Sequence, residues 1–115
     1  MTEKELLYYQ TASGKVPFQD WFNGVKDKMT RARIAKRLER VSLGNYGDHK
    51  AVGKGVFELR LFFGAGYRIY FGEDGKDIVL LLTGGDKNTQ NNDIANAQTF
   101  WQEYQADKAK GKKRG

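Results

Sequence analysis

Five consecutive apolar residues, 78–82 (IVLLL), constrain the fold of this chain more than any other segment. Successive side chains of a β-strand point to opposite faces of its sheet, so this segment is apolar on both faces. A short run of this kind is typical of a buried strand. We therefore predict a strand over residues 77–83 at the centre of a sheet. Asp74-Gly75, a strong hairpin signal, lies just before it.

The residues before this strand predict two more antiparallel strands. Residues 56–63 (VFELRLFF) alternate, with Phe57, Leu59 and Leu61 on one face. A short turn at residues 64–66 leads into a strand over residues 67–72. Together these segments predict a three-stranded antiparallel meander. The polar, glycine-rich residues 45–55 are predicted to be a loop.

Apolar spacing predicts the elements around the meander. Residues 6–11 have the composition of a strand. One helix is predicted to begin at Pro17 and a second, capped by Thr30, to end at Gly44. A last helix is expected over residues 92–107. The order strand, helix, helix, antiparallel meander, helix indicates an α+β fold with helices packed on a twisted antiparallel sheet. Residues 1–107 are expected to form a single domain, and residues 108–115 a basic, disordered tail.

The scarcity of cysteine and histidine excludes several kinds of site. The 115 residues include no Cys and one His, His49, which excludes disulfides, thiolate zinc sites, cysteine nucleophiles and two-histidine metal sites. We expect no metal and no cofactor. No apolar run approaches the roughly 20 residues that span a bilayer. The N-terminus also lacks a signal-peptide pattern, so a cytoplasmic location with no membrane partner is expected.

Positive charge is concentrated in the second predicted helix. The chain has a net charge of +6, and residues 31–40 carry five Lys or Arg against one Glu. Such a cluster suits nucleic acid, and it would also suit an acidic protein. Arg33 and Arg37 are our candidate RNA contacts on this helix. The alternative is an ordinary solvated helix face.

The meander places arginine and aromatic side chains on one sheet face. A three-residue loop after residue 63 would set Phe62 opposite Arg68 and Arg60 opposite Tyr70, with Glu58 on the same face. Arginine binds phosphate through a planar fork of donors, and aromatic rings stack on unpaired bases. Phe62 and Tyr70 are therefore candidate RNA contacts. The alternative is that Arg60 pairs with an acid while the aromatics pack beneath a helix.

A second polar cluster follows the predicted central strand. Residues 84–90 (GGDKNTQ) lie at a strand-to-helix junction, where backbone N–H groups favour anions. Simple helix capping by Thr89 or Asn91 is the alternative. His49, in the polar loop, is better explained as an ordinary loop residue than as a catalytic one.

Three segments together resemble a known family. They are VPFQDWF (16–22), ARIAKRLERVSLGNYGDHKAVGKGVFELRLFFGAGYRIYF (32–71) and VLLLTGGDKNTQNNDIANAQTFW (79–101). These segments resemble the HigB-like, phage-type addiction module killer proteins of the RelE/ParE toxin superfamily. The resemblance covers residues 7 to 104 in unbroken order. It is most specific in the GNYGD loop, the GVFELR…GAGYRIYF hairpin and the GGDKNTQ…DI segment.

The resemblance implies a RelE-like fold and an activity. RelE-like toxins are ribosome-dependent mRNA endonucleases that drive a ribose 2′-hydroxyl onto the adjacent phosphate, using Lys and Arg, often with Tyr or His, and no metal. The resemblance implies that three residues are catalytic: Arg68 in GYR, Arg60 on the preceding strand and Lys87 after the last strand. Lys54 is proposed as a further catalytic cation, and Lys50 as an RNA contact.

This chain departs from the RelE pattern at the general base. The RelE strand before the turn bears alternating lysines, where this chain has Glu58 and Leu59, and the C-terminal tail contains no Tyr or His. Lys54, His49 and Tyr70 remain as alternatives for the base.

The resemblance also implies partners. We expect the toxin of a type II toxin–antitoxin system, an endoribonuclease acting on mRNA at the ribosome. A small cognate antitoxin, typically with a helix-turn-helix, would form a hetero-oligomer with it. The alternatives are a ParE-like, non-enzymatic inhibitor of DNA gyrase and an inert remnant that only binds its antitoxin.

Overall fold

The apolar segment at residues 78–82 lies in an interior strand, as predicted. In the computed structural model, which describes the backbone of residues 3–114 and the side chains of residues 3–111, five strands form one sheet in the order β1-β5-β4-β3-β2. In β5 (Ile78–Gly85), residues 79–82 are all buried. β4 (Tyr67–Asp74), rather than β5, is the central strand of the sheet.

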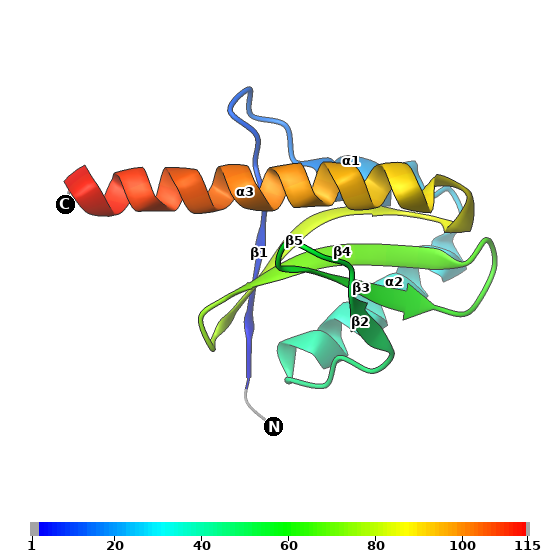
Figure 1. Ribbon diagram of the computed structural model, residues 1–115. Helices are drawn as coiled ribbons and strands as arrows, with labels where there is room; N and C mark the ends of the chain where they lie inside the picture. Colours follow the sequence, from blue (N-terminus) through cyan, green and yellow to red (C-terminus); the bar gives the residue numbers. More distant parts are fainter. Residues whose placement is uncertain (1–2, 115) are drawn as a thin grey trace.

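The remaining elements confirm the α+β class (Figure 1). They are β1 (Glu5–Tyr8), α1 (Pro17–Gly24), α2 (Lys28–Ser42), β2 (His49–Ala51), β3 (Val56–Leu61), a short 3-10 helix η1 (Lys87–Thr89) and α3 (Gln90–Arg114).

The sheet is mixed, which corrects the prediction of an antiparallel sheet. β3, β4 and β5 form the predicted antiparallel meander, but β1 pairs with β5 in parallel, with Leu6 opposite Val79 and Tyr8 opposite Leu81. As an interior strand, β5 has the backbone N–H and C=O groups of both edges paired with neighbouring strands. β4 covers one edge and β1 the other. This long-range pairing has no local sequence signal.

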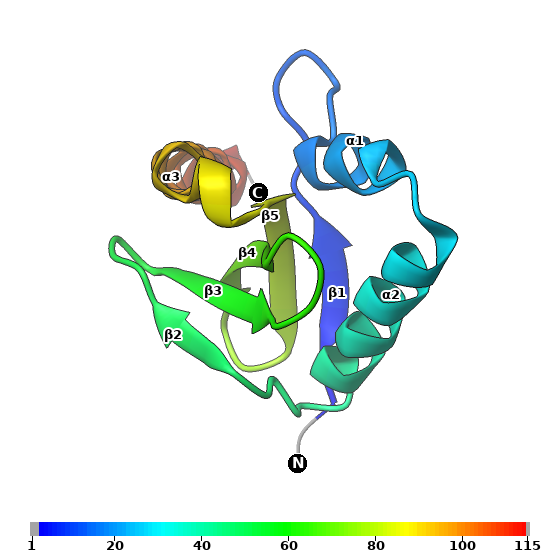
Figure 2. The ribbon, with the colours of Figure 1, turned by 90° about the vertical axis from the view of Figure 1, so that its right-hand side faces the viewer.

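Helices cover both faces of the sheet (Figure 2). α1 and α2 bury one face, where Ile34 and Leu38 pack with Leu59 and Leu81. α3 buries the other face, where Trp101 packs with Leu80 and Leu82. The two apolar sets of β5 therefore belong to two different core clusters, one on each side.

Three local predictions need correction. A short edge strand, β2, lies within the predicted loop, because its backbone pairs with β3. The cap of α2 is Asp27, whose carboxylate accepts hydrogen bonds from the backbone and hydroxyl of Thr30 at 3.1 and 2.7 Å, so Thr30 is not the cap. α3 continues to Arg114, through most of the residues that the sequence assigned to a disordered tail.

Within residues 3–114, no helix is both long and apolar enough to cross a membrane.

Candidate functional site

The β3–β4 hairpin sets the geometry of the site. Arg60 is the register partner of Arg68, and Glu58 is the partner of Tyr70, so the register differs by two residues from the prediction. The loop is longer than predicted, spanning residues 62–66. A shift of two preserves the face of every side chain, because strand side chains alternate with period two. The predicted grouping of these four residues on one face therefore survives the error in register.

Glu58 lies at the centre of a buried polar cluster on this face. Its side chain is fully buried, and Oε2 accepts hydrogen bonds from the Tyr70 hydroxyl (3.1 Å) and the Gln90 amide (2.8 Å). The Nε of Arg68 lies 3.6 Å from the same oxygen. Oε1 of Glu58 has no hydrogen-bond partner among the described residues. A buried carboxylate needs a cation, and Arg68 supplies it.

Arg68 and Lys87 meet at the hairpin loop. The Arg68 side chain is 13 % exposed, and Nη1 donates to the carbonyl of Gly66 at 2.9 Å. The backbone N–H of Lys87 donates to the carbonyl of Ala65 at 3.4 Å. A Cβ on Gly66 would lie 3.4 Å from Cβ of Lys87 and 3.6 Å from Nη1 of Arg68. The loop thus lies between the Arg68 guanidinium and the base of the Lys87 side chain, at the start of η1.

A carboxylate of α3 lies on the same face of the sheet, over Gly85. Gly85 is the register partner of Arg68, and a Cβ on Gly85 would lie 1.8 Å from Oδ2 of Asp93. Only glycine leaves room for this carboxylate on the sheet. The Thr89 hydroxyl donates to Oδ2 at 2.5 Å. Burial raises the pKa of the Asp93 carboxyl above its ordinary value, outweighing this hydrogen bond.

Helix capping explains part of the GGDKNTQ segment. Asp86 accepts hydrogen bonds from the backbone of Asn88 (2.8 Å) and Thr89 (3.2 Å), and Thr89 completes a capping box. The cap is thus Asp86, with Thr89 as the second member of the box. Capping leaves Lys87 exposed at the surface.

Tyr70 does not have the role that we predicted for it. Its ring is fully buried, so it offers no surface on which an RNA base could stack. Burial, followed by the charge of Glu58, raises the pKa of its hydroxyl far above the ordinary value. A phenol of this kind stays protonated at neutral pH and is a poor base. Tyr70 serves instead to hold Glu58.

Arg60 and Phe62 form a more exposed part of the site. Nε of Arg60 lies 3.2 Å from a carboxylate oxygen of Asp48, and its guanidinium lies 5.6 Å from the centre of the Phe62 ring. Phe62 is 77 % exposed. The Phe62 ring is therefore accessible, and it lies beside a partly exposed guanidinium. The acid that Arg60 pairs with belongs to the loop before β2, and is not Glu58.

The two predicted lysines occupy different places. Lys50 is exposed on β2 and is the register partner of Glu58, so it shares the face of the site. Lys54 lies beyond the far end of β3, which at about 3.3 Å per residue is about 20 Å from Arg60. The structure therefore does not bring Lys54 to Arg68.

His49 is separated from the cluster as well. It is the register partner of Leu59 and lies on the opposite sheet face from Glu58, with its ring 5.2 Å from that of Tyr46. Of the three residues considered for the base, neither Lys54 nor His49 is near Arg68, and Tyr70 is buried.

The two arginines of α2 differ from each other. Arg37 donates to the backbone carbonyls of Tyr46 (3.0 Å), Asp48 (2.7 Å) and Arg60 (2.7 Å), so its guanidinium anchors the loop before β2. This corrects its prediction as an RNA contact. Arg33 is exposed, and its guanidinium lies 4.9 Å from the centre of the Phe63 ring.

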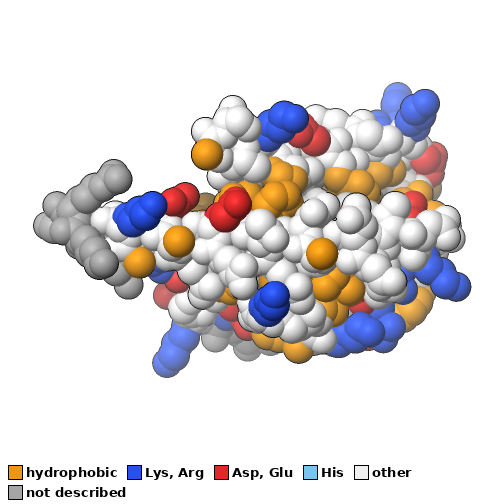
Figure 3. All heavy atoms as spheres, turned by 45° about the horizontal axis from the view of Figure 1, so that its top comes forward, with side chains coloured by type: hydrophobic (Ala, Val, Ile, Leu, Met, Phe, Trp, Pro, Cys, Tyr) orange, Lys and Arg blue, Asp and Glu red, His pale blue; other side chains and the backbone are white. Residues whose placement is uncertain are grey.

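Charge and metal-ligand geometry complete the description. Several Lys and Arg side chains lie at the end of the molecule opposite the C-terminus, where the β3–β4 loop also lies (Figures 1 and 3). Among the described residues, no group of three or more His, Cys, Asp or Glu is arranged to hold a metal ion.

Sequence reasoning missed Asp93 and Gln90. Both lie within the segment that carries the family resemblance, but their spacing resembles that of ordinary helix residues. The signal that would have found Asp93 is the second glycine after β5, because Gly85 leaves the space that its carboxylate fills. Gln90 has no comparable signal.

Comparison with known proteins gives one informative match. No protein-family model matches the chain. A protein of Haemophilus influenzae, described only as an uncharacterized protein, is 43 % identical over 86 residues, which is 75 % of this chain and 87 % of that protein. Identity at this level over most of both chains implies a shared fold and ancestry, and the chain belongs to the same protein family as this Haemophilus influenzae protein.

Proposed function

We propose that this chain is the toxin of a type II toxin–antitoxin pair, a cytoplasmic endoribonuclease that cleaves mRNA on the ribosome and arrests translation. One observation carries the proposal. Arg60 and Arg68 are direct cross-strand neighbours, and Lys87 joins Arg68 across the β3–β4 loop. Three cations are therefore grouped on one face, as cleavage of a phosphodiester requires. The α+β order and the GYR and GGDKNTQ motifs support the same proposal.

The site residues supply the groups needed for a transesterification in which the ribose 2′-hydroxyl attacks the adjacent phosphate. The ribose oxygen forms a bond to the adjacent phosphorus while the bond from phosphorus to the 5′ oxygen breaks. Arg68 and Lys87 neutralise the charge on the pentavalent phosphate. Asp93 takes the proton of the 2′-hydroxyl, since its raised pKa makes it a better base than an ordinary carboxylate. The ammonium of Lys87 gives a proton to the leaving oxygen.

The exposed residues hold the RNA chain. Arg60 and Lys50 contact phosphates, and Phe62 stacks on an unpaired base. A site of this kind lacks a deep substrate cleft, so it gains most when a second body fixes the 2′-hydroxyl in line with the phosphate. The ribosome provides that positioning for a translated message. A helix-turn-helix antitoxin would restrain the toxin in a hetero-oligomer.

The test is inducible expression combined with mapping of transcript 5′ ends. Cleavage should appear within translated messages, and in a purified translation system it should require translating ribosomes. Co-expression with the protein encoded beside this chain should block it. Robust, metal-dependent cleavage of naked RNA would refute the mechanism. Intact transcripts in growth-arrested cells would refute the nuclease itself.

A second candidate function is supported by a different observation. Glu58 and Tyr70 are both fully buried, and Arg68 is largely covered, which suits a structural core better than a working active site. This favours a ParE-like inhibitor that blocks DNA gyrase without chemistry. A gyrase supercoiling assay on the same purified chain distinguishes the two, because only the inhibitor would stop supercoiling. Binding of an antitoxin with neither effect would identify an inert remnant.

A further inference from the structure

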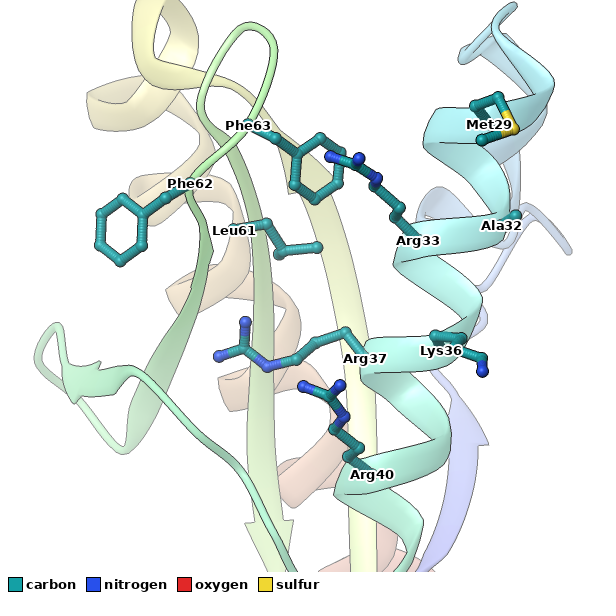
Figure 4. Close-up of a pocket in the computed structure, with 9 residues that line it drawn as sticks. All are labelled: Met29, Ala32, Arg33, Lys36, Arg37, Arg40, Leu61, Phe62 and Phe63. Carbon is teal, nitrogen blue, oxygen red and sulfur yellow. The ribbon is translucent and has the colours of Figure 1, made fainter.

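A basic groove runs between α2 and the β3–β4 hairpin, on the side of the sheet away from Glu58 and Asp93. It has a volume of about 380 Å3. The exposed side of α2 forms one wall, and the end of β3 with its loop forms the other (Figure 4). The residues that line this α2 groove are Met29, Ala32, Arg33, Lys36, Arg37, Arg40, Leu61, Phe62 and Phe63.

The groove combines an apolar surface with unpaired positive charge. Met29 is 68 % exposed, and Leu61 and Phe63 point from the hairpin toward α2, whereas the ring of Phe62 points away from it (Figure 4). Apolar surface beside a hollow of this kind suits an interaction site. Four of the lining residues are Lys or Arg and none is Asp or Glu. Within residues 3–111, Arg33, Lys36 and Arg40 make no ion pair with an acid. The groove therefore lacks both an apolar and an anionic partner.

The charge of Arg37 adds to this deficit. Burial lowers the pKa of Arg37, the charge of Asp48 opposes this effect, and the charge of Arg40 adds to it more weakly. Carboxylates brought into the groove would gain charge-assisted hydrogen bonds from the guanidiniums of Arg33 and Arg40.

We propose that the α2 groove binds an acidic amphipathic helix of a protein partner, which under the proposed function is the antitoxin. Interface cores are enriched in Met, Phe and Arg, as this groove is, and an amphipathic helix laid in a groove is a common form of recognition. From Met29 to Arg40 the wall is about 17 Å long, so it accommodates about three turns of helix. Leucine-type side chains would meet Met29, Ala32 and Phe63, and flanking acids would meet Lys36 and Arg40.

The other occupants fit less well. RNA binding uses exposed aromatic faces, but the Phe63 ring is already covered by Arg33, and Met29, Ala32 and Leu61 give a base nothing to stack on. A second copy of this chain, with its net charge of +6, would bring more positive charge towards the groove.

Binding in the groove also explains how a partner would restrain the toxin without entering the cluster around Arg68. Phe62 belongs both to the groove and to the proposed RNA-binding face, because its ring lies beside Arg60. A helix in the groove would lie against the loop that carries Phe62 and would deny this edge of the hairpin to RNA. Met29 and Lys36 lie outside the proposed catalytic and RNA-binding residues, so they separate binding of the partner from activity.

The experiment uses fluorescence anisotropy with the full chain and a labelled synthetic peptide. The peptide has a helical stripe of Leu at i, i+3, i+4 and i+7 with Glu at the flanking positions, and a second peptide has Lys in place of Glu. The acidic peptide should bind and the basic one should not. Met29→Ser and Lys36→Glu should each weaken binding about tenfold or more. Leu43→Ser and Lys76→Glu make the same changes at exposed sites outside the groove and should leave binding unchanged.

Several results would overturn the proposal. In one result, the acidic peptide fails to bind, and in a second, the control variants weaken binding as much as the groove variants do. In a third result, Met29→Ser lowers the affinity for a single-stranded RNA oligonucleotide and leaves the affinity for the peptide unchanged. The last result would assign the groove to RNA. Thermal melts verify that each variant is folded.

A second measurement separates this inference from the proposed function. In cells, Met29→Ser and Lys36→Glu should still arrest growth but should escape rescue by the co-expressed antitoxin. If the unaltered chain causes no growth arrest, the proposed function fails, while the peptide measurement still decides the role of the groove. If growth arrest occurs and both variants are rescued normally, the groove proposal fails alone.

Discussion

Arg68 owes its position to contacts on two sides. Glu58 lies against its Nε on the sheet, and the carbonyl of Gly66 accepts from Nη1 in the loop. Glu58 is itself fixed by Tyr70 and Gln90. The guanidinium is thus pre-organised before any substrate binds, which is how a charge-stabilising group gains its effect in a reaction.

Substitution of Arg68 should therefore affect activity and stability differently. Arg68→Lys keeps a cation near Glu58 but loses the guanidinium fork, so it should fold and should cleave about 10²-fold to 10³-fold more slowly. Arg68→Ala leaves the buried carboxylate of Glu58 without a cation and should also destabilise the fold, by about 3 kcal/mol. Cleavage rates and urea unfolding measure the two effects. A fully active, stable Arg68→Lys variant would remove the fork from the mechanism.

Asp93 gives a prediction for the pH dependence of activity. As the proposed base, it must be ionised, so the cleavage rate of the unaltered chain should rise with pH through the raised pKa of this carboxyl. Asp93→Asn should lose about 10²-fold or more in rate and should lose this pH dependence. Asp20→Asn makes the same change at an exposed site on α1 and serves as the control. An Asn variant with an unchanged pH profile would contradict the assignment.

The same carboxyl gives a prediction for stability. Because burial raises its pKa above 3.8, the folded state binds the proton more tightly than the unfolded chain does. The contribution of Asp93 to stability is fully present below pH 3.8 and is lost as the pH rises through the raised pKa. The melting temperature of Asp93→Asn, relative to the unaltered chain, should therefore increase between about pH 4 and about pH 7. A constant difference would show that the carboxyl does not resist ionisation.

At the scale of elements, α1 packs on β5 through one close approach. A Cβ on Gly84 would lie 2.2 Å from the Trp21 ring, so the indole lies directly on the strand backbone. No larger residue fits there without displacing the helix. The pair fixes the distance between α1 and the sheet, next to the strand end that carries Gly85 and the site.

Gly84→Ala should therefore destabilise the fold by about 1–3 kcal/mol, because the added methyl group overpacks a filled space. Gly24, at the end of α1, has no atom within 4 Å of the equivalent position, and Gly24→Ala is the matched control. The control should be neutral or more stable by about 0.5–1 kcal/mol. Chemical unfolding measures both variants. Equal effects of the two substitutions would show that Trp21 moves aside at little cost.

At the scale of the whole molecule, the end of α3 projects beyond the sheet (Figure 1). Residues 109–111 are exposed, whereas Trp101 and Tyr104 lie in or against the core. Lys108 forms an ion pair with Asp74. The side chains of residues 109–111 therefore add nothing to the core.

Removal of residues 109–115 should leave the melting temperature nearly unchanged, because it retains Lys108 and every core residue. It also removes four of the chain's 20 Lys and Arg residues. Affinity for RNA or ribosomes should fall, most visibly at about 50 mM salt. The affinity should also depend less steeply on the salt concentration. Thermal melts and salt titrations measure the two effects. A large loss of melting temperature would mean that the removed segment docks on the domain.

The sequence by itself determined the local elements and the faces of the strands. The IVLLL run required an interior strand, and alternation in β3 placed Glu58 and Arg60 on one face. Both inferences depend only on period two and on burial of apolar side chains, which act over a few residues. The predicted face of each residue is correct although the predicted register is wrong, because the two registers differ by an even number of residues.

Only the tertiary structure decided which of these residues meet. The parallel pairing of β1 with β5, the burial of Tyr70, the distance of Lys54 and the placement of Asp93 over Gly85 all depend on contacts between segments remote in sequence. Arg37 is a similar case, because three backbone carbonyls, two in the loop before β2 and one in β3, accept hydrogen bonds from a side chain that the sequence alone presents as a free cation. Helix and strand propensities depend on residues that are close in sequence, so they do not predict such contacts. They arise when the apolar faces of the helices and the sheet close on one another, and that closure decides which polar groups are buried together.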